Sequence, residues 1–486
     1  MHSITSGHDA TLLQLQYLTD SLGLRRSYLE EDDYTQGKNT SVSIATHVTH
    51  VTPDELENLA KPYSHSLALP VIRPDIEWHP SYDTYQARVA RLAQSQSDRP
   101  KTVPEGFPAR ISSSRAWTGS DFSDPDRYLI HLSAADVNEI KAALVHFKGL
   151  EDDNGPDSVS RDTFPLPTLS GKLFNVAQNV HRGTGFNVIR GLDPRDFSPL
   201  DNVLIYLGIT SHIAEIRGCQ DFDGRMIVHI KDIEQELPDA SGRPSPYTNR
   251  AQPFHTDMCD ILSMYVLDTA EKGGESLLSS GAMIYNELAA TRPDIIHALA
   301  DNKWIHDEVK ASWTNRPLLY NFEGHGPGFC YSRRPLTGAP FSPHRPDVPA
   351  MTEEQAEAID AVHFTAVKHQ LVIKLKPGDI EIFNNMALFH ARNGFKDRQQ
   401  DPDTETRLAV RDNSEALYKS TMNGTRHMLR LWLRSADENL AWKTPEALLH
   451  NHNQIYGDSE ARKIGRWDVH RAPPINRILT KHFKCS

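Results

Sequence analysis

Apolar residues recur at helical spacing in several separate stretches of the chain. Those between 137 and 147 form one stripe behind Ser133 and Asp136, residue types that favour the start of a helix. The same periodicity predicts helices over residues 82–92, 173–180, 281–301 and 353–368, with Pro293 placed to open the second half of the 281–301 segment. We expect most of these helices to cover a sheet.

Short β-branched and aromatic runs, separated by turn residues, predict the sheet itself. They are residues 185–191, 261–269, 276–278, 371–376, 380–383, 386–390 and 427–434. The Gly-containing turn at 271–274 predicts a hairpin between the second and third runs. Many short strands with covering helices favour an all-β core of the double-stranded β-helix type, a cupin-like jelly roll, over a parallel doubly wound sheet.

Polar, irregular sequence fills the first part of the chain. Residues 1–105 contain no chemical motif, and we expect them to form an N-terminal extension. Residues 106–486 contain the organised pattern, and we expect them to form the main domain. We expect the extension to carry no chemistry.

The net charge limits which classes of binding partner we expect. A net charge of −12 disfavours a nucleic-acid or anionic-membrane surface, since both are held by clustered Lys and Arg. The chain has no apolar run of about 18 residues and no basic leader followed by an apolar stretch, so we expect a cytoplasmic protein that does not bind membranes. A small-molecule substrate is the expected partner, and homo-oligomer formation is left open.

The triplet His255-Thr256-Asp257 offers two metal ligands on one face of an extended segment. Taken alone, the triplet has an ordinary alternative, a turn in which Asp257 caps the backbone. His390 lies in a predicted strand further along and would be the third ligand. Two imidazoles and one carboxylate leave three positions of an iron ion open, two for a chelating 2-oxo acid and one for dioxygen.

The run 426–434 alternates between leucine and arginine. Leu429, Leu431 and Leu433 lie on one face, with Arg426, Arg430 and Arg434 on the other. If the leucines pack on helices, the arginines point into the barrel, where burial favours pairing with a carboxylate. An edge strand with a solvated arginine face is the alternative.

With these motifs the chain resembles the taurine dioxygenase and 2,4-dichlorophenoxyacetate dioxygenase (TauD/TfdA) family, in particular its longer fungal members. The likeness runs from Phe107 to Trp442, and its anchors are 185–192, 255–257, 273–276, 389–392 and 426–434. The resemblance implies an iron(II)- and 2-oxoglutarate-dependent dioxygenase with O2 as oxidant. It further implies oxidation of a C–H bond in a small organic acid or amino-acid-like substrate, with release of succinate and CO2.

Residue by residue, the resemblance implies that His255, Asp257 and His390 hold the iron. Ser276 and Arg426 match the pair that binds the distal carboxylate of 2-oxoglutarate, and Arg430 matches an arginine that approaches the substrate anion or the co-substrate.

The interval between His390 and Arg426 departs from the family pattern, because a charged insertion at about 396–423 makes it longer. Arg407 or Arg411 within this insertion is an alternative carboxylate partner. Two alternative functions stay open: a non-catalytic jelly-roll metal-binding protein, and a cupin-like metalloenzyme that does not use 2-oxoglutarate. Trp304, Trp313 and Tyr331 are candidates for either the substrate pocket or the core.

Overall fold

The computed structural model describes residues 76–95, 98–151, 155–234, 243–307, 313–345, 347–399 and 424–469. Contacts divide the chain after Leu69, and every described residue belongs to the unit that begins at Pro70. Within the described residues, no helix combines the length and the apolar character needed to cross a membrane.

The main helices and strands follow one another along the chain in a mixed order. The longer helices are α3 (Tyr82–Ser95), α4 (Ala134–Lys148), α5 (Ser170–Arg182), α6 (Pro199–Ser211), α7 (Gly281–Thr291), α8 (Pro293–Ala300), α10 (Glu353–His369) and α13 (Leu449–Tyr456). The strands of the two main sheets are β1 (Leu129–His131), β2 (Phe186–Arg190), β3 (Ile216–Gly218), β4 (Val228–Lys231), β5 (Gln252–His255), β6 (Ile261–Asp268), β8 (Ser276–Ser280), β13 (Leu371–Ile373), β14 (Ile380–Asn384), β15 (Leu388–Arg392) and β17 (His427–Arg434).

Shorter elements complete the described part. They are β7 (Lys272–Gly273), β9 (Ile305–Asp307), β10 (Trp313–Asn315), β11 (Leu319–Phe322), β12 (Gly326–Phe329), β16 (Phe395–Lys396), α9 (Arg334–Thr337) and α14 (Glu460–Ile464). Single turns of 3-10 helix lie at 119–122, 125–127, 156–158, 194–196, 245–247 and 446–448.

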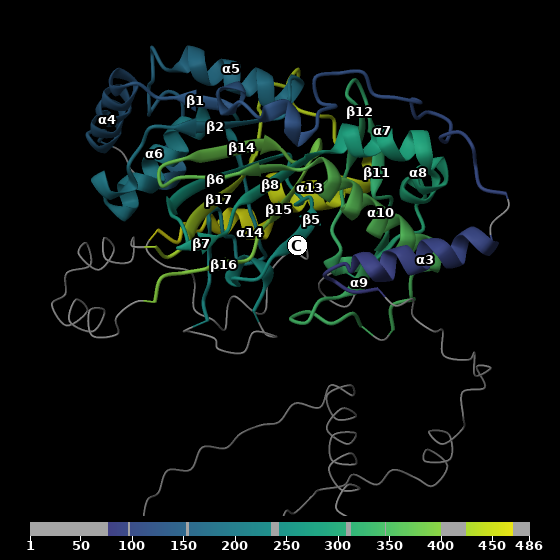
Figure 1. The fold of residues 1–486 in the computed structure, drawn as a ribbon. Coiled ribbons are helices and arrows are strands. Elements are labelled where there is room, and N and C mark those ends of the chain that lie inside the picture. Colours follow the sequence, from purple (N-terminus) through teal and green to yellow (C-terminus); the bar gives the residue numbers. More distant parts are fainter. Residues whose placement is uncertain are drawn as a thin grey trace, which may run out of the picture. The chain divides into compact units, whose positions relative to one another are not determined.

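Two sheets form the centre of this unit (Figure 1). The larger has seven strands in the order β1-β2-β14-β6-β17-β3, with β4 also paired to β17, and the smaller has the order β13-β8-β15-β5. The β1–β2 pair is parallel, and the other strand pairs of both sheets are antiparallel. The sequence therefore correctly predicted a largely antiparallel, sheet-rich core with helices.

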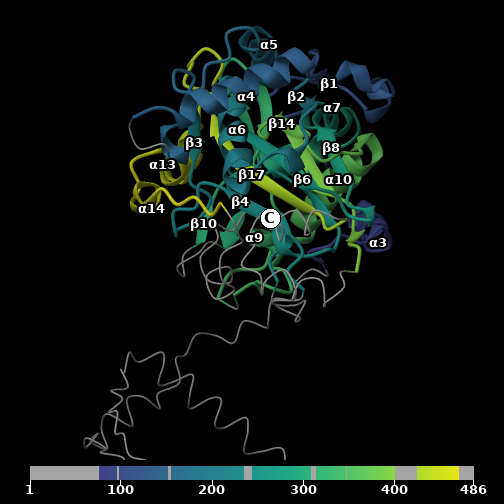
Figure 2. The same ribbon diagram turned by 90° about the vertical axis from the view of Figure 1, so that its left-hand side faces the viewer.

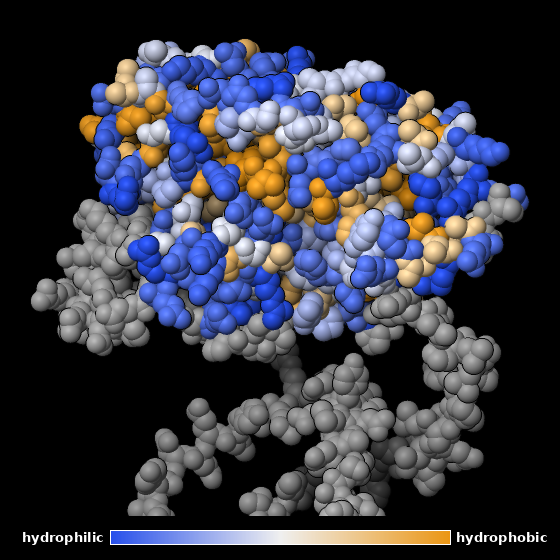
Figure 3. All heavy atoms as spheres, viewed as in Figure 1, coloured by the Kyte–Doolittle hydropathy of each residue, from blue (hydrophilic) through white to orange (hydrophobic). Residues whose placement is uncertain are grey.

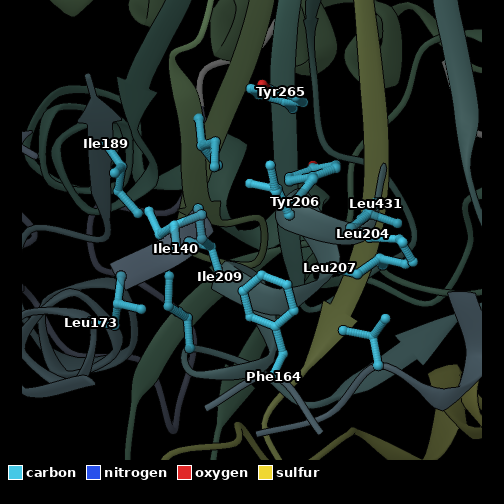
Figure 4. Packing of buried hydrophobic residues seen from close by; sticks show 14 of the residues in the cluster. Ile140, Phe164, Leu173, Ile189, Leu204, Tyr206, Leu207, Ile209, Tyr265 and Leu431 are labelled. Atoms are coloured by element: carbon cyan, nitrogen blue, oxygen red, sulfur yellow. The ribbon is translucent and has the colours of Figure 1, made fainter. Parts of the chain in front are cut away.

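Three large clusters contain most of the buried apolar side chains of the described residues. One contains inward residues of both sheets, such as Leu262, Leu278 and Trp432. A second joins the other face of the larger sheet to α4, α5 and α6, and Figure 4 shows Leu204 and Leu207 of α6 near Leu431. A third covers the outer face of the smaller sheet with α7, α8 and α10. The sheets are thus enclosed by helices on both sides, as the view in Figure 2 also shows.

The exterior of the unit differs from this interior. The face drawn in Figure 3 is mainly hydrophilic, with hydrophobic residues gathered near its middle. Burial of apolar side chains between and outside the sheets is the main source of stability for this arrangement.

Predicted helices and strands match the structure closely where local signals are strong. Ser133 and Asp136 form a reciprocal capping box at the start of α4, and Pro293 opens α8. Such caps satisfy backbone N–H groups that have no partner within a helix, so they define where a helix begins.

The predicted hairpin at 271–274 is wrong. β6 pairs with β14 and β17 in the larger sheet, whereas β8 pairs with β13 and β15 in the smaller one. The turn therefore carries the chain from one sheet to the other. A glycine-rich turn allows a reversal without specifying which strand becomes the partner.

The described part of the predicted extension has a defined place in this unit. Arg88 of α3 is fully buried, and its Nη1 donates to Oδ2 of Asp360 on α10 over 2.7 Å. Arg333 donates to the other oxygen of Asp360 over 2.8 Å. Residues 76–95 thus belong to the same packed structure as the strands.

Candidate metal centre and co-substrate site

His255 and His390 lie side by side on neighbouring strands of the smaller sheet. They are register partners at the β5–β15 junction, and their ring centroids are 4.1 Å apart. Asp257 follows two residues after His255. One candidate ligand atom from each of the three side chains lies within 4.8 Å of the others, and all three residues are buried. The structure therefore brings the predicted triad together.

Both imidazoles are arranged as neutral ligands. The ring Nδ1 of His255 lies 2.9 Å from the carbonyl oxygen of Pro253, so donation there leaves Nε2 free to bind a metal. Nδ1 of His390 has no hydrogen-bond partner in the segments that the structure describes. Burial lowers the pKa of His255. Burial and the neighbouring ring of His255 together hold the pKa of His390 well below its usual value.

Asp257 has one engaged and one unengaged oxygen. Oδ2 accepts from Nη1 of Arg430 over 2.8 Å and from Nε1 of Trp432 over 3.0 Å. Oδ1 is buried, has no hydrogen-bond partner within the described part of the chain, and lies 3.7 Å from Nε2 of His255. Burial alone would raise the pKa of Asp257, but Arg430 and the two histidines lower it. An ionised carboxylate with one free oxygen fits a divalent metal ligand.

The backbone around Asp257 is fixed by Asn385, in the turn before β15. The Asn385 Oδ1 accepts from the Asp257 N–H over 2.8 Å, and its Nδ2 donates to the carbonyls of Asp257 and Cys259 over 2.8 and 2.7 Å. This side chain therefore links the His255–Asp257 segment to the strand that carries His390.

The alternation predicted for β17 is present. Leu429, Leu431 and Leu433 belong to the cluster under α6, so the opposite face of the strand points between the sheets. Arg430 on that face donates from Nε to Oε1 of Gln220 over 2.9 Å, in addition to its bond with Asp257. The structure thus places Arg430 beside a candidate metal ligand.

Arg426 immediately precedes β17, and it is buried at the end of the site away from Arg430. Its Nε and Nη1 have no hydrogen-bond partner among the residues outside the undescribed 400–423 segment and the other gaps, and its guanidinium carbon lies 5.3 Å from the centre of the Phe395 ring. Gly274, at φ +77°, makes room for this side chain, because a Cβ there would lie 3.0 Å from Cδ of Arg426. Burial lowers the pKa of Arg426 to about 10, which leaves it charged at neutral pH.

Sequence reasoning missed Glu381, which faces Ser276 across the two sheets. Ser276 Oγ lies 2.9 Å from each carboxyl oxygen of this fully buried residue. Burial raises the pKa of Glu381 to about 7, against the opposing influence of Ser276 and Arg426. The alternation within β14 carried the signal, since Ile380 and Ile382 face the helices and Glu381 must therefore face inward.

A pocket next to His255 was also missed. It is small, with room for about one water molecule, and is lined by Trp78, Ser245, Gln252, Pro253, Ser332 and Arg333. The candidates Trp304 and Tyr331 lie instead in the core cluster under α7 and α10. Arg407 and Arg411, the alternative carboxylate partners, lie outside the described residues.

Comparison with known proteins agrees with this geometry. Residues 149–411 match the family model described as "Taurine catabolism dioxygenase TauD, TfdA family". The taurine hydroxylase-like protein SAT17 of Stachybotrys chartarum is 35% identical over 358 residues, which cover 71% of this chain and 85% of that protein.

Two more distant similarities were found. The FR-33289 synthase of Streptomyces rubellomurinus is 20% identical over 282 residues, covering 57% of this chain and 76% of that protein. A solved structure of asparagine oxygenase with Fe(II), 2S,3S-3-hydroxyasparagine and succinate is 13% identical, covers 64% of this chain and 94% of that one, and has a TM-score of 0.46. The family model and the 35% identical relative show that the chain belongs to the TauD/TfdA family and is an iron(II)- and 2-oxoglutarate-dependent dioxygenase.

Proposed function

We propose that the enzyme oxidises a C–H bond of a small organic molecule at an iron ion held by His255, Asp257 and His390, and that it releases succinate and CO2. The observation that carries the proposal is the buried triad, in which Oδ1 of Asp257 and Nδ1 of His390 have no hydrogen-bond partner among the described residues. Unpartnered polar atoms are rare in protein interiors, so a ligand is expected to satisfy at least one of them.

When bound, iron(II), 2-oxoglutarate and O2 together supply the oxidising chemistry, with one oxygen atom ending in succinate and the other in the oxidised substrate. The chain's own residues orient these reactants. Neutral His255 and His390 and ionised Asp257 form a three-residue metal site, while Arg430 and Trp432 fix the rotation of the Asp257 carboxylate. Three protein ligands leave positions for the co-substrate and O2.

Arg426 is the residue we propose for the distal carboxylate of 2-oxoglutarate. Two of its guanidinium nitrogens are buried without a partner in the described ranges, and Ser276 lies on the facing strand β8. A bidentate pair with a carboxylate would offset the cost of burying this cation. In the structure Ser276 binds Glu381, so we propose that the Ser276 hydroxyl is shared between Glu381 and the co-substrate.

We also propose the finer architecture expected from the sequence, a double-stranded β-helix. The successive strands β13, β14 and β15 support it, because they alternate between the smaller and the larger sheet. This alternation brings His390 next to His255 while keeping Glu381 on the opposite sheet.

Alanine variants of the three ligands test the proposed function. We expect His255→Ala, Asp257→Ala and His390→Ala to lose bound iron and 2-oxoglutarate-dependent succinate formation, with circular dichroism unchanged. His306→Ala is the matched control, because His306 is also a buried histidine and lies outside the triad. If any triad variant retains its full iron content, the substituted residue is not a metal ligand. No succinate from the iron-loaded wild type would favour a metalloenzyme that does not use 2-oxoglutarate.

A further inference from the structure

Arg392 is a buried cation on the same face of β15 as the candidate metal ligand His390. The two residues are two positions apart, so their side chains leave the strand in the same direction. In the antiparallel register of the smaller sheet, Arg392 lies directly opposite Ser276 of β8. The Arg392 side chain therefore starts beside the hydroxyl that we propose for the co-substrate, about 7 Å along the strand from His390.

Arg392 and Arg426 come together at the ring of Phe395. Their guanidinium carbons lie 5.0 and 5.3 Å from the centre of this ring. Arg426 reaches the ring past Gly274, which precedes Ser276 by two residues. Two buried cations, one from the smaller sheet and one next to the larger sheet, thus lie at the same end of the site.

One nitrogen of the Arg392 guanidinium is fixed by the backbone. Its Nη2 donates to the carbonyl of Thr248 over 2.7 Å and also to the carbonyl of Arg250. Nε and Nη1 of Arg392 make no hydrogen bond with a described residue, and the same is true of Nε and Nη1 of Arg426. The backbone therefore sets the orientation of the Arg392 guanidinium, and the other two nitrogens can donate to a ligand.

The electrostatics of the two arginines favour an anion between them. Burial, followed by the charge of Arg426, holds the pKa of Arg392 well below its usual value, against the opposing influence of Asp232 and Asp397. Asp232 pairs with Arg243 over 2.6 Å. Asp397 accepts the backbone N–H of Arg426 over 2.8 Å. Two neighbouring buried cations repel each other, and a carboxylate that contacts both offsets this repulsion and the loss of hydration.

We propose that Arg392 is a second anchor for the distal carboxylate of 2-oxoglutarate and that, together with Arg426, it makes the site select a 2-oxo acid with an anionic far end. The inference rests on the proposed function, because it assumes that Arg426 and Ser276 hold this carboxylate. It adds a residue for which the resemblance implied no role. Arg392 donates from Nε or Nη1 to one carboxylate oxygen, while Arg426 binds the other.

Binding of two 2-oxo acids tests the role of Arg392 without requiring turnover. The full chain, loaded with Fe(II), would be titrated calorimetrically under nitrogen with 2-oxoglutarate and with 2-oxopentanoate, which has a methyl group in place of the distal carboxylate. Arg392→Met should weaken 2-oxoglutarate binding about 10- to 100-fold, the effect of losing a hydrogen bond to a charged group, and should change 2-oxopentanoate binding by less than about two-fold. Arg392→Lys should recover part of the 2-oxoglutarate affinity, because it restores the charge.

Arg217→Met is the matched control. Arg217 is also buried and also donates to two backbone carbonyls, those of Pro156 and Val159, so its loss should leave both affinities unchanged. Equal weakening of the two 2-oxo acids by Arg392→Met would overturn the proposal, since a purely structural residue has that effect. Unchanged 2-oxoglutarate binding with a lower urea midpoint would also overturn it, because Arg392 would then pair with the protein, for example with an acidic residue of the undescribed 400–423 segment.

Arg426→Leu provides a test that leaves Arg392 in place. If Arg392 contributes, this variant should bind 2-oxoglutarate more weakly than the wild type but still about ten-fold more tightly than 2-oxopentanoate. Equal affinity of Arg426→Leu for the two acids overturns the proposal, even if Arg392→Met does not fold. If the iron-loaded wild type binds neither 2-oxo acid, the proposed function fails instead.

Discussion

Nη1 of Arg430 lies 2.8 Å from Oδ2 of Asp257, and the two side chains form a buried ion pair. Because this pair engages one carboxylate oxygen, the other is left facing His255. Arg430 therefore acts on the metal site through Asp257, by keeping the carboxylate ionised and by setting its rotation. Its neighbour Trp432 performs the second of these tasks with an N–H group.

Arg430→Leu should weaken iron(II) binding by about 10- to 100-fold, the usual effect of losing a partner of a metal ligand. Anaerobic competition with a chelator measures this affinity. Arg434→Leu is the control, because Arg434 lies on the same face of β17 but pairs with Asp260. If Arg430→Leu leaves the iron affinity unchanged and weakens the binding of anionic substrates, Arg430 contacts the substrate anion, as the resemblance implies.

Arg426→Leu should weaken 2-oxoglutarate binding by roughly 2 to 5 kcal/mol, because a buried carboxylate would lose its cation. Calorimetric titration under nitrogen measures the change. Arg426→Lys should recover part of the affinity, since it restores the charge without the bidentate geometry. Arg407→Leu and Arg411→Leu belong in the same series. If either of these abolishes binding and Arg426→Leu does not, the charged insertion carries the anchor.

Glu381 should make co-substrate binding depend on pH. It is surrounded by Ser276 of β8, Arg426 before β17, Asp379 before its own strand and Tyr128 before β1. Its pKa of about 7 means that it gains a negative charge as pH rises from 6 to 8 and then repels the distal carboxylate. We expect 2-oxoglutarate binding to weaken by about ten-fold over this range. Glu381→Gln should flatten the profile, and an equal slope in that variant assigns the pH dependence to another group.

The same residue gives a stability prediction of defined sign. The pKa of Glu381 is about 7 in the folded protein and 4.5 in its unperturbed state, so folding favours the protonated form. Its contribution to the free energy of unfolding is fully present below pH 4.5 and is lost as pH rises through about 7. We expect a loss of about 3 kcal/mol, measured as urea midpoints of wild type against Glu381→Gln. If Glu381→Gln loses as much stability as the wild type when the pH rises through about 7, the prediction is wrong.

The ion pairs of α3 predict different effects for two neighbouring arginines. Arg88→Leu should destabilise the protein by roughly 1 to 3 kcal/mol, because buried Asp360 keeps Arg333 but loses one partner. Arg91→Leu, at a side chain that is 57% exposed, should change stability by less than about 0.5 kcal/mol. Urea denaturation separates the two, and equal effects would mean that α3 does not depend on the buried pair.

Truncation extends this comparison. A protein that starts at Pro70 should keep iron and 2-oxoglutarate binding and full stability, because it retains Arg88. A protein that starts at residue 106 should still bind iron and 2-oxoglutarate, but it should unfold at a lower urea concentration, because buried Asp360 loses Arg88. Titrations and urea denaturation of both truncated proteins against the full chain check these outcomes, and an unchanged urea midpoint after the longer truncation would contradict the role of Arg88.

Much of the fold and the triad could be predicted because the signals are local. The capping residues Ser133 and Asp136 define the start of α4, and the two-residue period of β17 places its leucines against α6. The spacing of His255 and Asp257 suggested a shared ligand face, and the structure places these residues together with His390.

What the sequence did not predict depends on contacts between distant segments. The glycines before Ser276 indicate a turn, but whether β6 and β8 pair is decided by competition with β14 and β15. Trp78 reaches the pocket through Arg333 and Asp360, which no local pattern connects to it. Glu381 alternates with Ile380 and Ile382 in β14, and its inward direction follows only once the covering helices are placed on the isoleucine face.

The bonds from Asn385 to the backbone of Asp257 join residues that are 128 positions apart in the chain. During synthesis, the segment with His255 and Asp257 leaves the ribosome long before β15, so the growing chain holds two of the three ligands for most of that interval. Two ligands alone should retain iron poorly. Iron capture is therefore expected to be a late event, delayed until β15 has emerged and paired with β5 and β8. Iron should then report on completed folding of this domain rather than initiate it.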